Sequence, residues 1–194
     1  SSTVRMLMDP EVPNYTTNSS YHLAIDYAEG IYMGYRYYET VYAELMKATD
    51  EKTADAWYSE AVAFPYGYGL SYTNFEFKNM QVSTDSLTEA NKEADITVKV
   101  DVTNKGAVAG KTVVQLYSTP DYIPGEVEKA SVNLVGYTKT PIIAVGKTET
   151  VEVKINAKDL ASFDYNDANK NEHFAYEIDA GKVELKVMEN SHEE

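Results

Sequence analysis

The densest cluster of possible cation ligands in the sequence lies in its last third. Calcium takes carboxylate and amide oxygens as ligands, and one short segment offers several of them. These residues are Asp164, Asn166, Asp167, Asn169 and Glu172. The segment differs from an EF-hand loop because no glycine occupies its turn and no helical pattern flanks it. Asx-rich segments between strands usually form turns stabilised by side-chain-to-backbone hydrogen bonds, so we expect a turn here and no metal ion.

Nucleophilic chemistry has little support in the sequence. The chain has no cysteine, which excludes disulfides, thiol nucleophiles and cysteine-ligated zinc. Its three histidines, His22, His173 and His192, are scattered and lack the spacing of a metal site. Ser71 does not lie in a Gly-x-Ser-x-Gly elbow. We therefore predict no catalytic, cofactor-binding or metal-binding residue in this chain.

The overall composition indicates a folded, acidic protein. The 194 residues are 43% hydrophobic and 25% charged, which suits one sizeable core or two small ones. A net charge of −14 disfavours binding to nucleic acids and to anionic membrane surfaces, so neutral substrates fit better. No stretch approaches the roughly 20 apolar residues of a membrane span. We expect a soluble bacterial protein, cytoplasmic or secreted, and a fragment of a longer chain because Ser1 is not an initiator residue.

Two different patterns precede residue 64. From Tyr21 to Tyr38, alternating aromatic and β-compatible residues predict a strand, and residues 1–26 before it predict an irregular lead-in. In this strand Arg36 is expected to have a structural role, either holding a carboxylate, with Glu29 as a candidate partner, or stacking on an aromatic ring. From Thr40 to Val62 the apolar spacing predicts two short helices that separate at Asp50-Glu51-Lys52.

The second of these helices carries Trp57, the only tryptophan of the chain. Tryptophan faces often stack on sugars in carbohydrate sites. At helical spacing, however, a single tryptophan more often packs in a core, and we expect the core position here.

The segment from Phe64 to Phe75 is predicted to be a hinge. Pro65 fixes its own φ angle, while Gly67 and Gly69 permit backbone angles that are closed to other residues. Beyond Leu70 the hydrophobic period becomes two, as in half-buried strands. We therefore expect one unit at residues 1–63, a mixed α/β lead-in with a helical insertion, and a second at residues 64–194.

About seven strands are predicted in the second unit. They are expected near residues 73–77, 96–102, 114–116, 132–137, 151–155, 174–178 and 183–187. Turn signals separate them at the spacing of an antiparallel β-sandwich of the immunoglobulin or fibronectin type III kind. Tyr165 is expected to hold the crossing between the two sheets through a hydroxyl bonded to nearby backbone.

Three motifs in order along the chain resemble one enzyme family. They are Tyr27-Ala28-Glu29-Gly30-Ile31-Tyr32-Met33-Gly34-Tyr35-Arg36-Tyr37-Tyr38, Phe64-Pro65-Tyr66-Gly67-Tyr68-Gly69-Leu70-Ser71-Tyr72-Thr73, and Val102-Thr103-Asn104-Lys105-Gly106 followed by Ala109-Gly110-Lys111-Thr112-Val113-Val114-Gln115-Leu116-Tyr117. They are similar to segments of glycoside hydrolase family 3, the β-glucosidase family. The resemblance places the first near the end of the α/β sandwich domain, the second before the fibronectin type III-like domain, and the third within it. It covers roughly Tyr27 to Val187.

For the intact protein, the resemblance implies retaining hydrolysis of a terminal β-linked glucose or related sugar, without a cofactor. Such enzymes need two carboxyl groups about 5 to 5.5 Å apart. In the family, the nucleophile is a barrel-domain aspartate, commonly within Ser-Asp-Trp, and the acid/base is a glutamate upstream of the matched segments. Here Trp57 follows Asp55-Ala56, and a barrel of about 250 residues could not fit. We therefore expect the chain alone to be inactive and to support the catalytic domains.

The resemblance also suggests partners and leaves alternatives open. The expected partners are the remaining catalytic domains and, through them, a β-glycoside substrate. Asp121, Tyr122 and Glu126 belong to a loop that is a candidate for the substrate entrance. The barrel could precede or follow this segment, since some family members have an inverted domain order. The alternatives are a non-catalytic carbohydrate-binding or adhesion sandwich, and a sandwich that forms a homo-oligomer contact.

Overall fold

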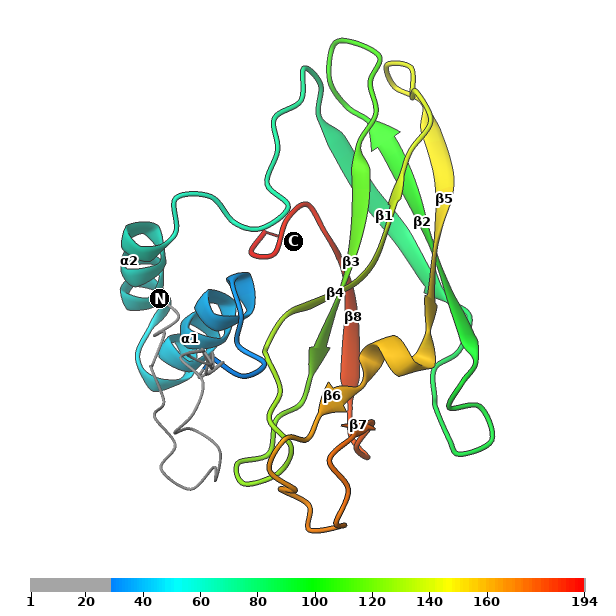
Figure 1. Ribbon diagram of the computed structural model, residues 1–194. Coiled ribbons are helices and arrows are strands. Elements are labelled where there is room, and N and C mark those ends of the chain that lie inside the picture. The colour runs from blue at the N-terminus through cyan, green and yellow to red at the C-terminus, as the bar shows by residue number, and fades with distance from the viewer. Residues whose placement is uncertain (1–28, 194) are drawn as a thin grey trace, which may run out of the picture.

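A computed structural model describes residues 29–193, so the predicted lead-in at residues 1–26 lies outside the described part. Two helices come first, and a β-sandwich follows. Figure 1 shows the helices beside the sandwich, joined to it by the long connection from α2 to β1. Within the described residues, no helix is both long and apolar enough to cross a membrane.

The two predicted helices are present as α1, Tyr35–Ala48, and α2, Glu51–Ala61. They separate where the sequence predicted, because the Asp50 side chain caps α2 by accepting a hydrogen bond from the Thr53 N–H at 2.8 Å. The prediction of a strand from Tyr21 to Tyr38 is wrong over its described part: residues 29–34 form turns and irregular structure, and α1 begins at Tyr35. Strand propensity needs a neighbouring strand to pair with, and no strand in the described part of the chain pairs with this segment.

Two three-stranded antiparallel sheets form the sandwich, which confirms the predicted fold class. One sheet has the order β1-β2-β5 and the other the order β4-β3-β8. The strands are β1 Phe75–Val82, β2 Asp95–Asn104, β3 Val113–Pro120, β4 Asn133–Lys139, β5 Thr148–Asn156 and β8 Val183–Met188. A one-turn 3-10 helix, Ala157–Leu160, follows β5. The strand predicted at residues 174–178 is shorter in the structure: it is the two-residue strand β7, Tyr176–Glu177. It pairs with another two-residue strand, β6, Ser162–Phe163, which was not predicted.

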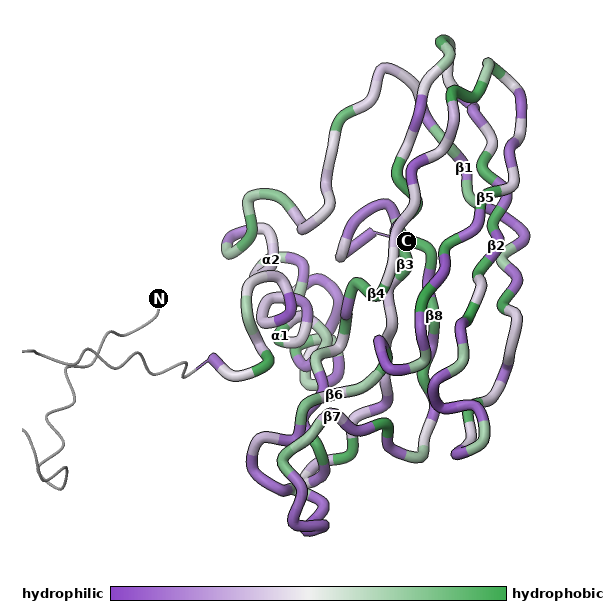
Figure 2. Tube along the Cα trace, turned by 45° about the vertical axis from the view of Figure 1, so that its right-hand side comes forward, coloured by the Kyte–Doolittle hydropathy of each residue, from purple (hydrophilic) through white to green (hydrophobic). Residues whose placement is uncertain are grey.

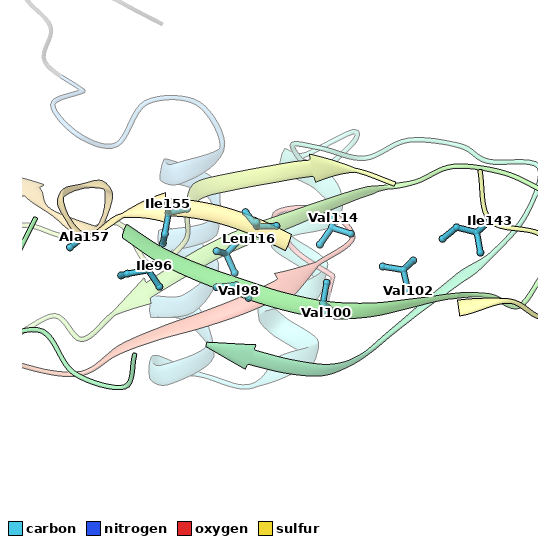
Figure 3. Packing of buried hydrophobic residues seen from close by; sticks show 10 residues of the cluster. Ile96, Val98, Val100, Val102, Val114, Leu116, Ile143, Ile155 and Ala157 are labelled. Carbon is cyan, nitrogen blue, oxygen red and sulfur yellow. The ribbon is translucent and has the colours of Figure 1, made fainter. Parts of the chain in front are cut away.

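The core lies between the two sheets and follows the period of two. In β2, Ile96, Val98, Val100 and Val102 are all buried, while the side chains between them are exposed or half-buried. Figure 3 shows these residues and the β3 side chains Val114 and Leu116 gathered in the layer between the strands. The sheets approach closely at Gly136 of β4, where an added Cβ would lie 2.6 Å from a methyl group of Ile155.

A buried asparagine stabilises one end of the sandwich. Asn104 accepts hydrogen bonds from the Thr73 hydroxyl at 2.7 Å and the Gly106 N–H at 3.0 Å. Its amide donates to the carbonyls of Val108 at 2.8 Å and Ile143 at 2.9 Å. The motif that begins Val102-Thr103-Asn104 therefore closes the end of β2 around a polar side chain that is completely satisfied.

The predicted hinge is a largely exposed connection rich in apolar side chains. Phe64 is 70% exposed, Leu70 is 90% exposed and Tyr72 is 99% exposed. Figure 2 shows hydrophobic stretches on this connection as well as along the strands. Gly67 has a φ of 85°, a region that favours glycine, and an added Cβ would lie 2.1 Å from the side-chain oxygen of Gln115.

Candidate functional site

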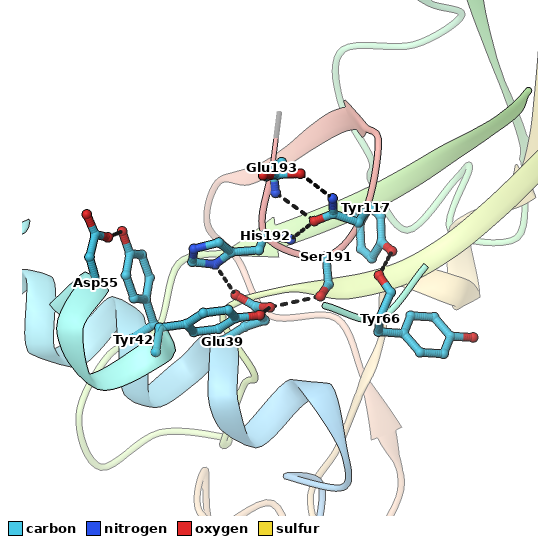
Figure 4. Close-up of polar contacts among 10 residues, drawn as sticks. Glu39, Tyr42, Asp55, Tyr66, Tyr117, Ser191, His192 and Glu193 are labelled. Atoms are coloured by element: carbon cyan, nitrogen blue, oxygen red, sulfur yellow. Dashed lines mark hydrogen bonds and ion pairs between the residues drawn. The ribbon is translucent and has the colours of Figure 1, made fainter. Parts of the chain in front are cut away.

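A buried carboxylate joins the helices to the C-terminal loop of the sandwich. Glu39 of α1 is 3% exposed. One of its oxygens accepts hydrogen bonds from the Tyr58 hydroxyl of α2 at 2.6 Å and from Ser191 Oγ at 2.8 Å, and the other lies 3.0 Å from His192 Nδ1. We call Glu39, Tyr42, Tyr58, Ser191 and His192 the Glu39 cluster, which Figure 4 shows in close-up.

Aromatic packing completes the Glu39 cluster. The His192 ring stacks on Tyr58, with centroids 3.8 Å apart, and meets Tyr42 edge-on at 4.6 Å. The loop that carries His192 is itself held by Asn190, whose side-chain oxygen accepts the His192 and Glu193 N–H groups, each at 2.9 Å. The two neighbouring helices and a C-terminal loop far from them in the sequence are therefore joined by hydrogen bonds and ring contacts.

A second set of contacts fixes the hinge to β3. Gln115 donates hydrogen bonds to the carbonyls of Gly67 at 3.2 Å and Glu189 at 2.6 Å, and accepts one from the Tyr117 hydroxyl at 2.8 Å. The Tyr66 carbonyl accepts the Ser191 N–H at 2.8 Å. The hinge and the C-terminal loop are thus bound to the same strand and to each other.

Tyrosine ionisation in this region is shifted to higher pH. Burial, followed by the hydrogen bond to Glu39, raises the pKa of Tyr58, and burial raises the pKa of Tyr117. Burial and the 2.9 Å hydrogen bond to Asp55 raise the pKa of Tyr42 to about 12. These phenols stay protonated near neutral pH and act as hydrogen-bond donors. Ser191 donates to Glu39 rather than to His192, so the cluster is no serine–histidine nucleophile.

A concave hollow lies between the turn before α1, the start of β4 and the segment after β5. We call it the hollow; its volume is about 1140 Å³. Its lining includes Tyr32, Glu128, Asn133, Lys158, Phe163, Tyr165 and Tyr176. Aromatic faces, a carboxylate, an amide and an ammonium group therefore surround one space.

The charge of Glu128 raises the pKa of two tyrosines that line the hollow, Tyr32 and Tyr165. Burial, then the charge of Glu128, raises the pKa of Tyr32 to about 12, and Tyr122 contributes to the same shift. The pKa of Tyr165 is also raised, first by Glu128. Tyr122 therefore lies near the hollow, although it belongs to the exposed loop after β3. Asp121 and Glu126, the other two residues predicted for a substrate entrance, are exposed on that loop and do not line the hollow.

Arg36 and Glu29, predicted as possible partners, both line the hollow. Arg36 Nε is buried and has no hydrogen-bond partner within residues 29–193. Trp57 is half-buried and packs 6.3 Å from Tyr38 and 6.5 Å from Tyr58, ring centroid to ring centroid. It therefore belongs to the packing of the two helices.

The predicted role of Tyr165 at the sheet crossing is wrong. Tyr165 is 48% exposed and follows β6, and its side chain is hydrogen-bonded to the Glu128 side chain. The buried tyrosine that contacts backbone is Tyr117 of β3, whose hydroxyl lies 3.4 Å from the Tyr66 carbonyl.

The segment after Tyr165 forms the turns that the sequence predicted. Asp164 accepts the N–H groups of Asn166 and Ala168, at 3.2 and 3.1 Å, and Asp167 accepts that of Glu172 at 3.0 Å. Across residues 29–193, no group of three histidine, cysteine or acidic side chains has the arrangement of a metal site.

Sequence reasoning missed the residues that join the helices to the sandwich. Glu39 gave no signal, and His192 was noted only for lacking metal spacing. The contact between Glu39 and Ser191 spans 152 positions, so no local pattern could indicate it. Gln115 and Tyr117 did carry a signal, because both lie in a motif that resembled the family.

Comparison with known proteins identifies the sandwich. A model of the fibronectin type III-like domain matches residues 112–191. The chain is 35% identical to β-glucosidase A of Butyrivibrio fibrisolvens, over 81% of this chain and 18% of that protein. It therefore spans about a fifth of the length of the relatives it matches.

Solved structures agree with this match. β-Glucosidase 3B from Thermotoga neapolitana superimposes with a TM-score of 0.63 and 32% identity, over 87% of this chain and 19% of that one. A family 3 β-glucosidase from Bifidobacterium adolescentis superimposes with a TM-score of 0.65 and 25% identity, over 95% of this chain and 22% of that one. The chain therefore belongs to glycoside hydrolase family 3, as the part of a β-glucosidase-like protein that comprises the fibronectin type III-like domain and the segment before it.

Proposed function

We propose that this chain is a non-catalytic part of a β-glucosidase-like hydrolase and that it supports the domains that carry out retaining hydrolysis of a terminal β-glycoside. The remaining domains of that protein are its partners, and the glycoside is bound through them. In this proposal residues 1–63 belong to the α/β sandwich domain, and residues 64–194 form the hinge and the fibronectin type III-like domain.

The Glu39 cluster is the observation that carries this proposal. It joins α1 and α2 to the loop at Ser191 and His192 through a buried carboxylate with three polar contacts. A flexible connection between two independent modules would not need such a contact. The arrangement instead fixes the orientation of the helical segment on the sandwich, as a structural support requires.

The exposed side chains of the hinge give independent support. Phe64, Leu70 and Tyr72 are 70–99% exposed on one short connection, and large apolar side chains gathered on one exposed segment often mark a contact surface. Further domains of the parent protein would remove these side chains from water. The loop of Asp121, Tyr122 and Glu126 is exposed on the sandwich, where it could approach a substrate entrance.

The test is hydrolysis of a chromogenic β-glucoside by this chain and by the chain extended in both directions to its natural ends. Activity of only the extended protein is the expected result. Turnover by the 194-residue chain would overturn the assignment of both catalytic carboxyls to other domains. Inactivity of both proteins, with the extended one folded, would argue against the hydrolase function itself.

A further inference from the structure

We propose that the hollow is a non-catalytic binding site for a neutral oligosaccharide. The hollow has no part in the support role assigned above to the Glu39 cluster and the hinge. The proposal rests on the proposed function only for the choice of the saccharide.

The size of the hollow suits more than one sugar ring. Pockets for small ligands are typically about 300–1,000 Å³, and the hollow, at about 1140 Å³, lies just above that range. The hollow is neither an enclosed cavity nor a flat surface, so a chain of sugar rings could extend out of it.

Aromatic side chains that the core does not use line this space. Phe163 of β6 and Tyr176 of β7 pack with ring centroids 5.1 Å apart, yet they are 36% and 76% exposed. Tyr165 is 48% exposed and lies two residues beyond Phe163. A pyranose ring presents an apolar C–H face, and exposed aromatic faces beside polar groups are suited to pack against it.

Both hydrogen-bond donors and hydrogen-bond acceptors line the hollow beside the aromatic rings. Glu128 offers carboxylate oxygens that accept hydrogen bonds, Lys158 offers an ammonium group that donates them, and Asn133 carries an amide that can do both. A sugar hydroxyl both donates and accepts, so this mixture matches a saccharide better than it matches a simple anion or cation. The phenols of Tyr32 and Tyr165 stay protonated near neutral pH; that of Tyr165 is hydrogen-bonded to Glu128, and that of Tyr32 adds a further donor.

Charge limits the class of saccharide. Glu29, Glu128 and Asp159 line the hollow against Arg36 and Lys158, and the whole chain carries a net charge of −14. A uronate-containing oligosaccharide would therefore meet repulsion, whereas a neutral one would not. Because the hollow is built by this chain alone, its binding can be measured without the rest of the parent protein.

The experiment is an NMR titration of the 194-residue chain with cellotetraose. We expect amide shifts to concentrate at residues 128–133, 158–165 and 176–177, with a dissociation constant in the range of about 1 mM. Tyr176→Ala should weaken binding by about three- to tenfold through loss of the aromatic face, and Tyr165→Phe, which keeps its ring, should change it less. Tyr137→Ala is the matched control, because Tyr137 is 70% exposed on β4 but does not line the hollow.

Several results would overturn the proposal. The first is the absence of amide shifts up to about 10 mM cellotetraose. The second is a set of amide shifts confined to the hinge at residues 64–72. The third is a loss of affinity in Tyr137→Ala equal to the loss in Tyr176→Ala. A tetragalacturonate that binds as tightly as cellotetraose would refute the preference for neutral sugars. Failure to bind would make the hollow a contact surface for the parent protein. It would leave the proposed function intact, since hydrolysis by the extended chain tests that separately.

Discussion

Removing the Glu39 carboxylate should release the two helices from the sandwich while leaving the sandwich folded. In Glu39→Ala, the Tyr58 and Ser191 hydroxyls lose a buried acceptor, and His192 Nδ1 loses its contact with the carboxylate. Each of the two hydrogen bonds to the charged group contributes about 1.5 kcal/mol, and the contact to His192, which is 21% exposed, contributes less. The docking free energy of the helices should therefore fall by about 3–4 kcal/mol.

Trp57 makes this prediction measurable, because it is the only tryptophan and packs beside Tyr58 in α2. Its fluorescence reports the helices, while far-UV circular dichroism near the β-sheet minimum reports the sandwich. In the unmodified chain the two urea transitions should coincide. In Glu39→Ala the fluorescence transition should move to lower urea and separate from the other, and amide exchange should accelerate in α1 and α2.

The control variant is Glu44→Ala on the same helix, whose exposed carboxylate pairs only with the exposed Lys47 in the contacts observed for it. In Glu44→Ala, the free energy of unfolding obtained from either urea transition should change by less than about 0.5 kcal/mol. The reasoning is refuted if Glu39→Ala leaves the two transitions coincident and unshifted, or if Glu44→Ala has the same effect.

Three further predictions concern the sandwich and the tyrosines. Asn104→Ala should lower the free energy of unfolding of the sandwich by about 3 kcal/mol, because four hydrogen bonds of its side chain are lost. Chemical denaturation measures this loss, and Asn171→Ala, at an exposed position, is the control. A loss in Asn104→Ala close to that of the control would contradict the prediction. Gly136→Val should lower the free energy of unfolding by about 1–3 kcal/mol, because the new Cβ would lie 2.6 Å from a methyl group of Ile155. An unchanged free energy of unfolding in chemical denaturation would show that the two sheets can separate locally. The pKa of Tyr42 rises from 10 to about 12 on folding, so its contribution to stability is complete below pH 10 and is lost as the pH rises towards 12. Ultraviolet titration should show several phenols that ionise above pH 10, with one fewer in Tyr42→Phe, and an unchanged number would refute the assignment.

The strands could be predicted from sequence because their signal is local. Ile96, Val98, Val100 and Val102 alternate with more exposed residues, and this pattern alone places one face of β2 in a core. The start of α1 could not be placed in the same way. Tyr35, Arg36 and Tyr37 favour a strand by type, but a strand forms only beside a partner, and without one the segment takes the helical geometry of the residues that follow.

The contacts that define the site depend on distant pairs, which no spacing rule reveals. Glu39 would be expected on an exposed helix face from its residue type alone, and it is buried only because Tyr58, Ser191 and His192 meet it there. The error at Tyr165 has a similar cause. A tyrosine near a sheet crossing suggested a corner, but the backbone contact is made by Tyr117, a residue 48 positions earlier.

The hinge combines a fixed backbone with exposed side chains, and this combination bears on how the parent protein assembles. Gln115 holds the Gly67 carbonyl, and Ser191 holds that of Tyr66, so the middle of the hinge is bound to the sandwich. On either side, Phe64 and Leu70 remain 70% and 90% exposed. A binding surface whose backbone is already ordered loses less conformational entropy when a partner covers it. The backbone of the hinge at Tyr66 and Gly67 is therefore ordered on the sandwich before the proposed docking of any other domain, and the buried polar residue Gln115 of β3 makes one of the two contacts that order it.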